Sequence, residues 1–151
     1  MKKALITIII GIILVAGSYG VFQYNKYKEK PITDILTHLE DSKVSSITVD
    51  KIANLKIENT YQFDESETEI IKSLKELKVH RTKSDFGVLD CEYSVSLVFE
   101  KGIDTVYLYG DKKEIIIATD TESWGNRHFK ASSSDFFDIV ETLIANNKEH
   151  E

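Results

Sequence analysis

The segment from Ala4 to Phe22 most strongly constrains the fold. It contains nineteen residues without a charged side chain and follows Lys2 and Lys3. An α-helix rises about 1.5 Å per residue, so this segment is long enough to cross the roughly 30 Å hydrocarbon core of a bilayer. We therefore predict a single-pass transmembrane helix that contacts membrane lipid through residues 4–22.

A secretory signal peptide is the alternative interpretation of this N-terminus. Two Lys precede the apolar core, and residues 16–18 offer the small side chains that a signal peptidase requires. The apolar run nevertheless continues to Phe22, so cleavage after residue 18 would leave an apolar stub exposed to water. We expect the segment to be retained as a signal anchor, with secretion of a cleaved product as the alternative.

Basic residues flank both ends of the apolar segment. Lys2 and Lys3 precede it, and Lys26, Lys28 and Lys30 follow it, so the positive-inside rule does not separate the two orientations. A short basic head before an apolar core is the pattern that export machinery recognises. We therefore expect the C-terminal domain to lie outside the cytoplasm, at the cell envelope.

The remaining chain is acidic. Residues 1–30 form the predicted anchor and juxtamembrane segment with a formal charge of +4, and residues 31–151 form a soluble domain that carries −10. An acidic domain repels nucleic acid, which we exclude as a partner. It also repels an anionic membrane surface, so Lys26–Lys30 is the only expected headgroup contact. The lone Cys91 permits no internal disulfide.

Alternating and helical periodicities predict an α+β domain with a mainly antiparallel sheet and helices packed on one face. Asp64 is the predicted start of the middle helix, because Glu67 follows it at capping-box spacing, with Ser66 and Glu69 as the competing pair. Ser132–Asp135 caps the last helix. The predicted helical stripes are 32–39, 70–77 and 136–144. The predicted strands are 43–50, 53–63 (with Ala53–Glu58 alternating cleanly), 79–82, 93–99, 105–109, 114–118 and 127–130, the last at a sheet edge.

Two parts of the domain share an apolar spacing. Five apolar residues from Phe63 onward recur 66 residues later from Phe129 onward, and a β-branched strand precedes each set. This pattern is consistent with a duplicated strand–strand–helix unit. The alternative is that any two capped amphipathic helices share such a stripe. The matched pairs are Phe63 and Phe129, Ile70 and Phe136, Ile71 and Phe137, Leu74 and Val140, and Leu77 and Leu143.

No residue pattern identifies a reaction. Cys91 lies between Asp90 and Glu92, whose charges disfavour a thiolate, so we interpret it as structural. The four His have no metal-helix spacing, and the acidic run 64–69 is typical of a helix N-terminus. The chain has no nucleophile-elbow or phosphate-loop motif. We therefore expect neither a metal nor another cofactor, and no enzymatic activity.

The segment from Asp120 to His128 is the best candidate for recognition. It combines the only Trp of the chain, Trp124, with Arg127 and His128, and Trp and Arg are enriched at binding hot spots. We identify these three residues as candidate partner-binding residues. The alternative is that Trp124 folds over the sheet as a lid on the core.

The layout resembles that of small uncharacterised membrane-anchored or exported proteins of Gram-positive bacteria. The resemblance consists of Lys2-Lys3, an apolar span and a small α+β domain, and it implies no site residue. We expect a non-catalytic domain that binds a protein at the cell envelope. The alternatives are a secreted domain with an unrecognised hydrolytic activity, which a convergent His–Asp pair would favour, and an immunity or anti-regulator protein.

Overall fold

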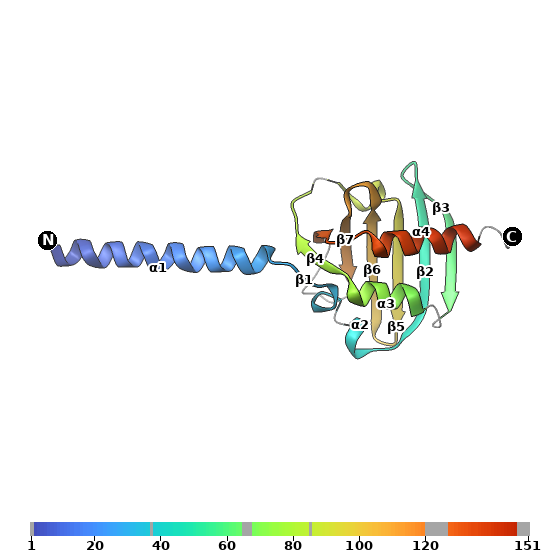
Figure 1. Cartoon of the computed structure of the whole chain (residues 1–151), viewed down its shortest axis with the longest axis horizontal. Helices are drawn as coiled ribbons and strands as arrows, with labels where there is room; N and C mark the ends of the chain where they lie inside the picture. Colours follow the sequence, from blue (N-terminus) through green and yellow to red (C-terminus); the bar gives the residue numbers. More distant parts are fainter. Residues whose placement is uncertain (1, 37, 65–67, 85, 120–126, 148–151) are drawn as a thin grey trace.

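A long N-terminal helix projects from an α+β domain in the computed structural model (Figure 1). The structure describes residues 2–36, 38–64, 68–84, 86–119 and 127–147. Helix α1 (Lys2–Tyr27) is long and apolar enough over Ile8–Tyr27 to cross a membrane. Its described side chains are largely exposed, because no element of the domain packs along it. The predicted apolar helix is therefore present.

Eight strands form one sheet in which every neighbouring pair is antiparallel, as the alternating sequence patterns predicted. Strands β1 and β3 lie at the two edges of the order β1-β4-β8-β7-β6-β5-β2-β3. The strands are β1 (Lys30–Pro31), β2 (Val44–Ala53), β3 (Lys56–Asp64), β4 (Lys78–Arg81), β5 (Tyr93–Phe99), β6 (Gly102–Tyr109), β7 (Glu114–Thr119) and β8 (Arg127–Ala131).

The two longest helices of the domain, α3 (Thr68–Glu76) and α4 (Asp135–Asn147), cross the same face of the sheet (Figure 1). Their apolar stripes are buried against it, since Leu74 and Val140 are both 0% exposed. The core therefore lies between the helices and the sheet, which confirms the predicted arrangement. The shorter helical segments are η1 (Ile32–Asp34), α2 (His38–Asp41), η2 (Val88–Asp90) and η3 (Gly110–Lys112).

The helix predicted over residues 32–41 is wrong as a continuous element. Its four apolar residues are all buried, but the chain forms the 3₁₀ turn η1 and then the short helix α2. Pro31, with φ −62° and ψ 147°, stands before the 3₁₀ turn, and Ile35 ends that turn at φ −111° and ψ −47°, where its N–H donates to the carbonyl of Ile32. Burial of the apolar side chains therefore decides this path more than helical hydrogen bonding does.

Strand β2 explains the uneven apolar spacing of residues 44–49. Its register against β5 shifts between Val44 and Ser46, so a β-bulge separates Val44 from the following apolar positions. The clean strand predicted for Ala53–Glu58 is wrong, because the chain turns within it. Asn54 and Leu55 have φ values of 52° and 61°, which match the two central residues of a type I′ hairpin turn.

Strand β8 is not the edge strand that the sequence suggested. It pairs with β7 on one side and with β4 on the other, so it lies inside the sheet. Its apolar residue Phe129 is only 2% exposed. The error arose because β4 returns to pair with β8 across a long sequence separation, which no local pattern reveals.

The proposed repeat has a geometric counterpart. Ile47 pairs with Phe63 on β2 and β3, and Ile115 pairs with Phe129 on β7 and β8. Each antiparallel pair is followed by a helix, and the two helices contact each other. The two strand–strand–helix segments therefore present matching apolar residues to one shared core.

Candidate functional site

The sheet face opposite α3 and α4 carries a row of polar side chains. The register places Thr60, Asp50, Ser94 and Tyr107 on neighbouring strands in that order. The Asp50 carboxylate accepts hydrogen bonds from the hydroxyl of Thr60 at 2.7 Å and from that of Ser94 at 3.1 Å. These bonds hold Asp50 at the surface of the sheet. The residues that they join, Thr60 and Ser94, do not include a catalytic partner for Asp50.

The segment that follows β4 covers part of this polar face. The ring of Phe86 stacks on Tyr109 with ring centroids 5.1 Å apart, and it meets the ring of His128 edge-on, also at 5.1 Å. His128 Nε2 lies 2.9 Å from the carbonyl oxygen of Phe86, to which it donates. His128 therefore holds the covering segment against the sheet.

Cys91 lies at the end of this covering segment and is only 2% exposed. Burial, followed by the charges of Asp90 and Glu92, raises the pKa of its thiol to about 12. A thiol with such a pKa is a poor nucleophile at neutral pH. The expected structural role of Cys91 thus agrees with its surroundings.

A His–Asp pair lies at the other end of the strands. His38 on α2 places Nδ1 3.4 Å from Oδ1 of Asp104 on β6, and its ring lies 5.5 Å from the ring of Phe99. Asp104 is 0% exposed, and its Oδ2 is buried without a hydrogen-bond partner among the described residues. Asp104 pairs with Thr119, the last residue of β7.

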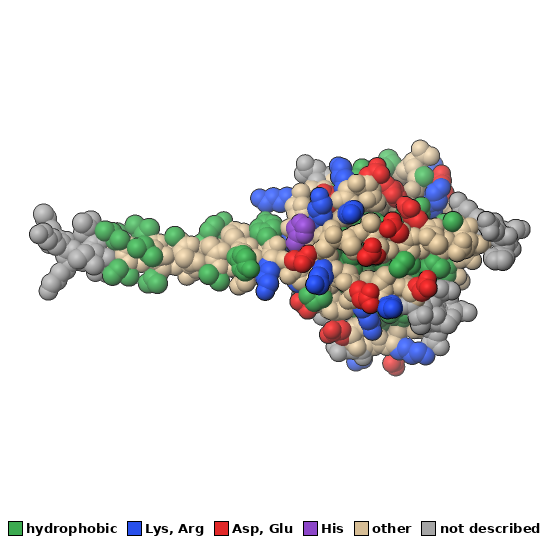
Figure 2. All heavy atoms as spheres, in the orientation of Figure 1, with side chains coloured by type: hydrophobic (Ala, Val, Ile, Leu, Met, Phe, Trp, Pro, Cys, Tyr) green, Lys and Arg blue, Asp and Glu red, His purple; other side chains and the backbone are tan. Residues whose placement is uncertain are grey.

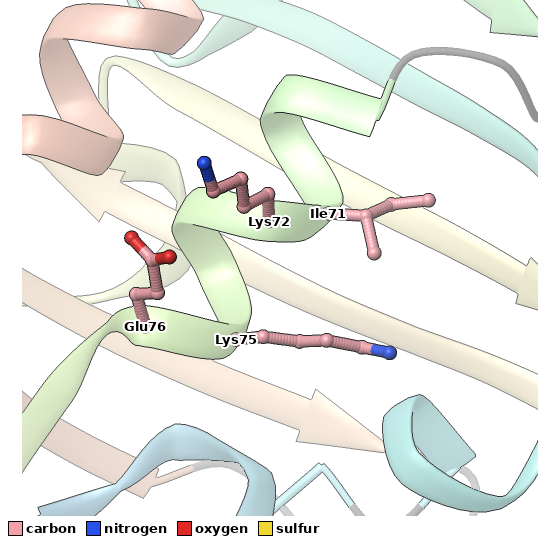
Figure 3. Close-up of a pocket in the computed structure, with 4 residues that line it drawn as sticks. All are labelled: Ile71, Lys72, Lys75 and Glu76. Atoms are coloured by element: carbon pink, nitrogen blue, oxygen red, sulfur yellow. The ribbon is translucent and has the colours of Figure 1, made fainter.

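A shallow hollow runs along one turn of α3 (Figure 3). It encloses about 420 Å³ and is lined by Ile71, Lys72, Lys75 and Glu76. Ile71 and Lys75 point to one side of the helix, whereas Lys72 and Glu76 point to the other (Figure 3). The polar side chains do not converge, and such convergence is what distinguishes a ligand site from a packing hollow.

The outer edge of β3 is the longest accessible strand edge in the described chain. Eight of its nine residues pair with β2 on one side, and no described strand pairs on the other. Ile57 on this strand and Leu55 in the preceding turn are each 61% exposed. Lys51 and Glu58 bridge the hairpin at 3.0 Å, and the Glu58 carboxylate raises the pKa of Lys51.

The three predicted partner-binding residues have different positions. His128 lies on β8 and is engaged with Phe86, which sequence patterns did not indicate. The backbone of Arg127 pairs with Ile117, and Trp124 lies outside the described residues. Their role in recognition stays a prediction. The contact between His38 and Asp104 was also missed, because 66 residues separate them.

The described residues contain no group of three or more His, Cys, Asp or Glu side chains that could hold a metal ion. Comparisons with protein-family models, with curated proteins and with solved structures found no match for this chain.

Proposed function

We propose that this protein is a membrane-anchored, non-catalytic binding domain that presents the outer edge of β3 to a protein partner at the cell envelope. The observation that carries the proposal is the nine-residue edge of β3, open among the described residues and flanked by two exposed aliphatic side chains. Strand edges of this length can pair with an extended segment of another chain.

The position of β3 supports this function. The sheet begins at β1, next to the membrane helix, and ends at β3, its opposite edge. Figure 1 shows β3 on the side of the domain away from α1. A chain retained by α1, with the domain outside the cytoplasm, thus directs this edge away from the bilayer. Exposed Leu55 and Ile57 add apolar surface beside the backbone edge.

The test uses the full-length protein, isolated from membranes with whatever it binds. Ile57→Lys should abolish capture of the partner while leaving the unfolding transition nearly unchanged, because the side chain is exposed. Ile103→Lys is a matched control, since Ile103 is 49% exposed and lies on β6, which β5 and β2 separate from β3. Undiminished capture by Ile57→Lys would contradict the role of β3.

An immunity or anti-regulator role would require the membrane span itself to take part in recognition. Exchanging residues 4–22 for an unrelated apolar span separates the two ideas. Capture that survives the exchange favours the domain as the binding element. Capture that is lost while the hybrid remains in the membrane favours recognition through the span.

The pair formed by His38 and Asp104 supports hydrolysis as a second candidate function. A buried carboxylate next to an imidazole is the arrangement that orients a general base. Hydrolysis further requires a nucleophile or an activated water within hydrogen-bond reach of the imidazole. His38→Gln should abolish turnover of a panel of fluorogenic esters and peptides if the pair is catalytic. Equal rates for the variant, the wild type and buffer would contradict catalysis.

A further inference from the structure

Two basic strands meet at the edge of the sheet next to the membrane helix. Residues 78–83 contain Lys78, Arg81 and Lys83, and residues 127–131 contain Arg127 and Lys130, with no acidic residue in either range. These ranges therefore carry a charge of +5, and the rest of residues 31–151 carries −15. The acidic domain thus has one basic region.

Strand pairing brings the two ranges together. His80 on β4 pairs with Lys130 on β8, although 50 residues separate them in the chain. The side chains of Lys78, Lys83 and Lys130 are exposed, and that of Arg81 is half-buried. We call these four residues the basic edge. Figure 2 shows Lys or Arg side chains and a His, together with Asp or Glu side chains, where α1 meets the domain.

A short and well-tethered connection holds the basic edge close to the bilayer. Helix α1 ends at Tyr27, and β1 begins at Lys30, which pairs with Val79 on β4. The Ser132 hydroxyl donates to the Glu29 carboxylate, and the Ser132 N–H donates to the carbonyl of Lys78 at 3.0 Å. Neighbouring strands lie about 4.8 Å apart, so β4 and β8 both lie near the end of the helix.

The distances match the headgroup layer. Phospholipid headgroups add roughly 5–8 Å to each side of the hydrocarbon core. Lys and Arg side chains that extend from β4 and β8 span a similar length. Two nearby carboxylates are already engaged by hydroxyls, Glu29 by Ser132 and Glu114 by Ser84.

We propose that the basic edge binds the anionic phospholipid headgroups of the adjacent leaflet and holds the sheet upright on the membrane. The acidic domain as a whole is expected to be repelled by an anionic membrane surface, whereas the basic edge is attracted to that surface. It extends the Lys26–Lys30 headgroup contact expected from sequence to residues 78–83 and 130. Because binding fixes β1 toward the bilayer, it leaves β3 facing outward. The inference rests on anchoring by α1, as the proposed function does.

The test uses the full-length protein in nanodiscs of phosphatidylcholine, with or without phosphatidylglycerol. Acetylation of each Lys by an amine-reactive ester is followed by mass spectrometry. Lys78, Lys83 and Lys130 should react roughly threefold or more slowly in anionic nanodiscs, because bound headgroups shield them. Lys56 and Lys101, both exposed on other parts of the sheet, should react equally in the two lipids. High salt should remove the difference.

Matched charge reversals complete the test. The double variant with Lys78→Glu and Lys130→Glu should lose the protection of Lys83. The control is the double variant with Lys56→Glu and Lys101→Glu, which changes the net charge equally and should keep that protection. Two results for the wild type would overturn headgroup binding, whatever the variants do. One is an equal acetylation rate of Lys83 in both lipids. The other is a lipid-dependent slowing of Lys56 as large as that of Lys83. If the protein enters the nanodiscs but its Lys side chains show no lipid-dependent protection, headgroup binding is overturned while anchoring by α1 is not. Failure to enter either nanodisc overturns the anchoring as well.

Discussion

Lys30 pairs with Val79, so the third residue beyond helix α1 already belongs to the sheet. Sequence patterns placed Lys30 in the anchor segment and began the soluble domain at Pro31. The observed pairing leaves only residues 28 and 29 between α1 and β1. The domain is therefore held close to the end of the helix by hydrogen bonds.

Retention of the N-terminal segment is the first prediction. The full-length mass should appear in the membrane fraction and resist extraction by high salt, because a retained α1 would bury its apolar side chains in lipid. Protease added to intact protoplasts should digest the domain if it lies outside the cytoplasm. A mature protein in the medium that begins at Tyr19 would contradict retention, and protection of the domain would reverse the orientation.

The second prediction concerns the core beneath α3. A fragment of residues 28–151 should fold without α1, and Leu74→Ala should lower its free energy of unfolding by about 2–5 kcal/mol. Leu74 is 0% exposed, so truncation leaves a cavity. Leu89→Ala is the matched control, since Leu89 is 54% exposed and the same truncation should cost under about 0.5 kcal/mol.

Chemical denaturation followed by circular dichroism measures both variants of the fragment. Val140→Ala on α4 should also destabilise it, by less than Leu74→Ala, because fewer buried atoms are removed. If Leu74→Ala and Val140→Ala lower the free energy of unfolding no more than Leu89→Ala does, α3 and α4 do not cover the core.

Cys91 supplies a prediction about alkaline pH. Its thiol has a pKa of about 12 in the folded chain against an ordinary value of 9.0, so the folded state favours the protonated form. The associated stability is present below pH 9 and is lost as pH rises toward 12. Relative to Cys91→Ala, the free energy of unfolding of the wild-type fragment should fall by roughly 1 kcal/mol more between pH 8 and pH 10.

The same pKa predicts slow alkylation of Cys91. Iodoacetamide at pH 8 should modify the folded protein orders of magnitude more slowly than the protein unfolded in urea, since both burial and thiol protonation oppose attack. Similar rates for the two states would show that the thiol is accessible and ionised. A stability difference between wild type and Cys91→Ala that does not change with pH would contradict the raised pKa.

The Trp124 segment provides the last prediction. If it is a recognition surface, Trp124→Ala should abolish partner capture and leave the melting midpoint nearly unchanged. Arg127→Ala should weaken capture too, through loss of charge-assisted and stacking contacts. If Trp124 is instead a lid on the core, Trp124→Ala should lower the free energy of unfolding by about 3–5 kcal/mol. Because Trp124 is the only Trp, blue-shifted emission that iodide does not quench would contradict recognition.

The sequence by itself determined the elements whose signals are local. An uncharged run specifies α1, two-residue alternation specifies strands such as β5, and helical spacing specifies the buried stripes of α3 and α4. Each signal depends on residues within a few positions of one another. For the same reason, the sequence also indicated that Cys91 is structural, since Asp90 and Glu92 adjoin it.

Only the tertiary structure decided which distant segments meet. It placed β8 inside the sheet, brought His38 to Asp104, and joined the basic strands β4 and β8 beside α1. Such pairings depend on how all the strands together bury one core and on the cost of closing long loops. Neither quantity is encoded in local periodicity, so the sequence did not indicate that Lys78, Lys83 and Lys130 lie together beside α1.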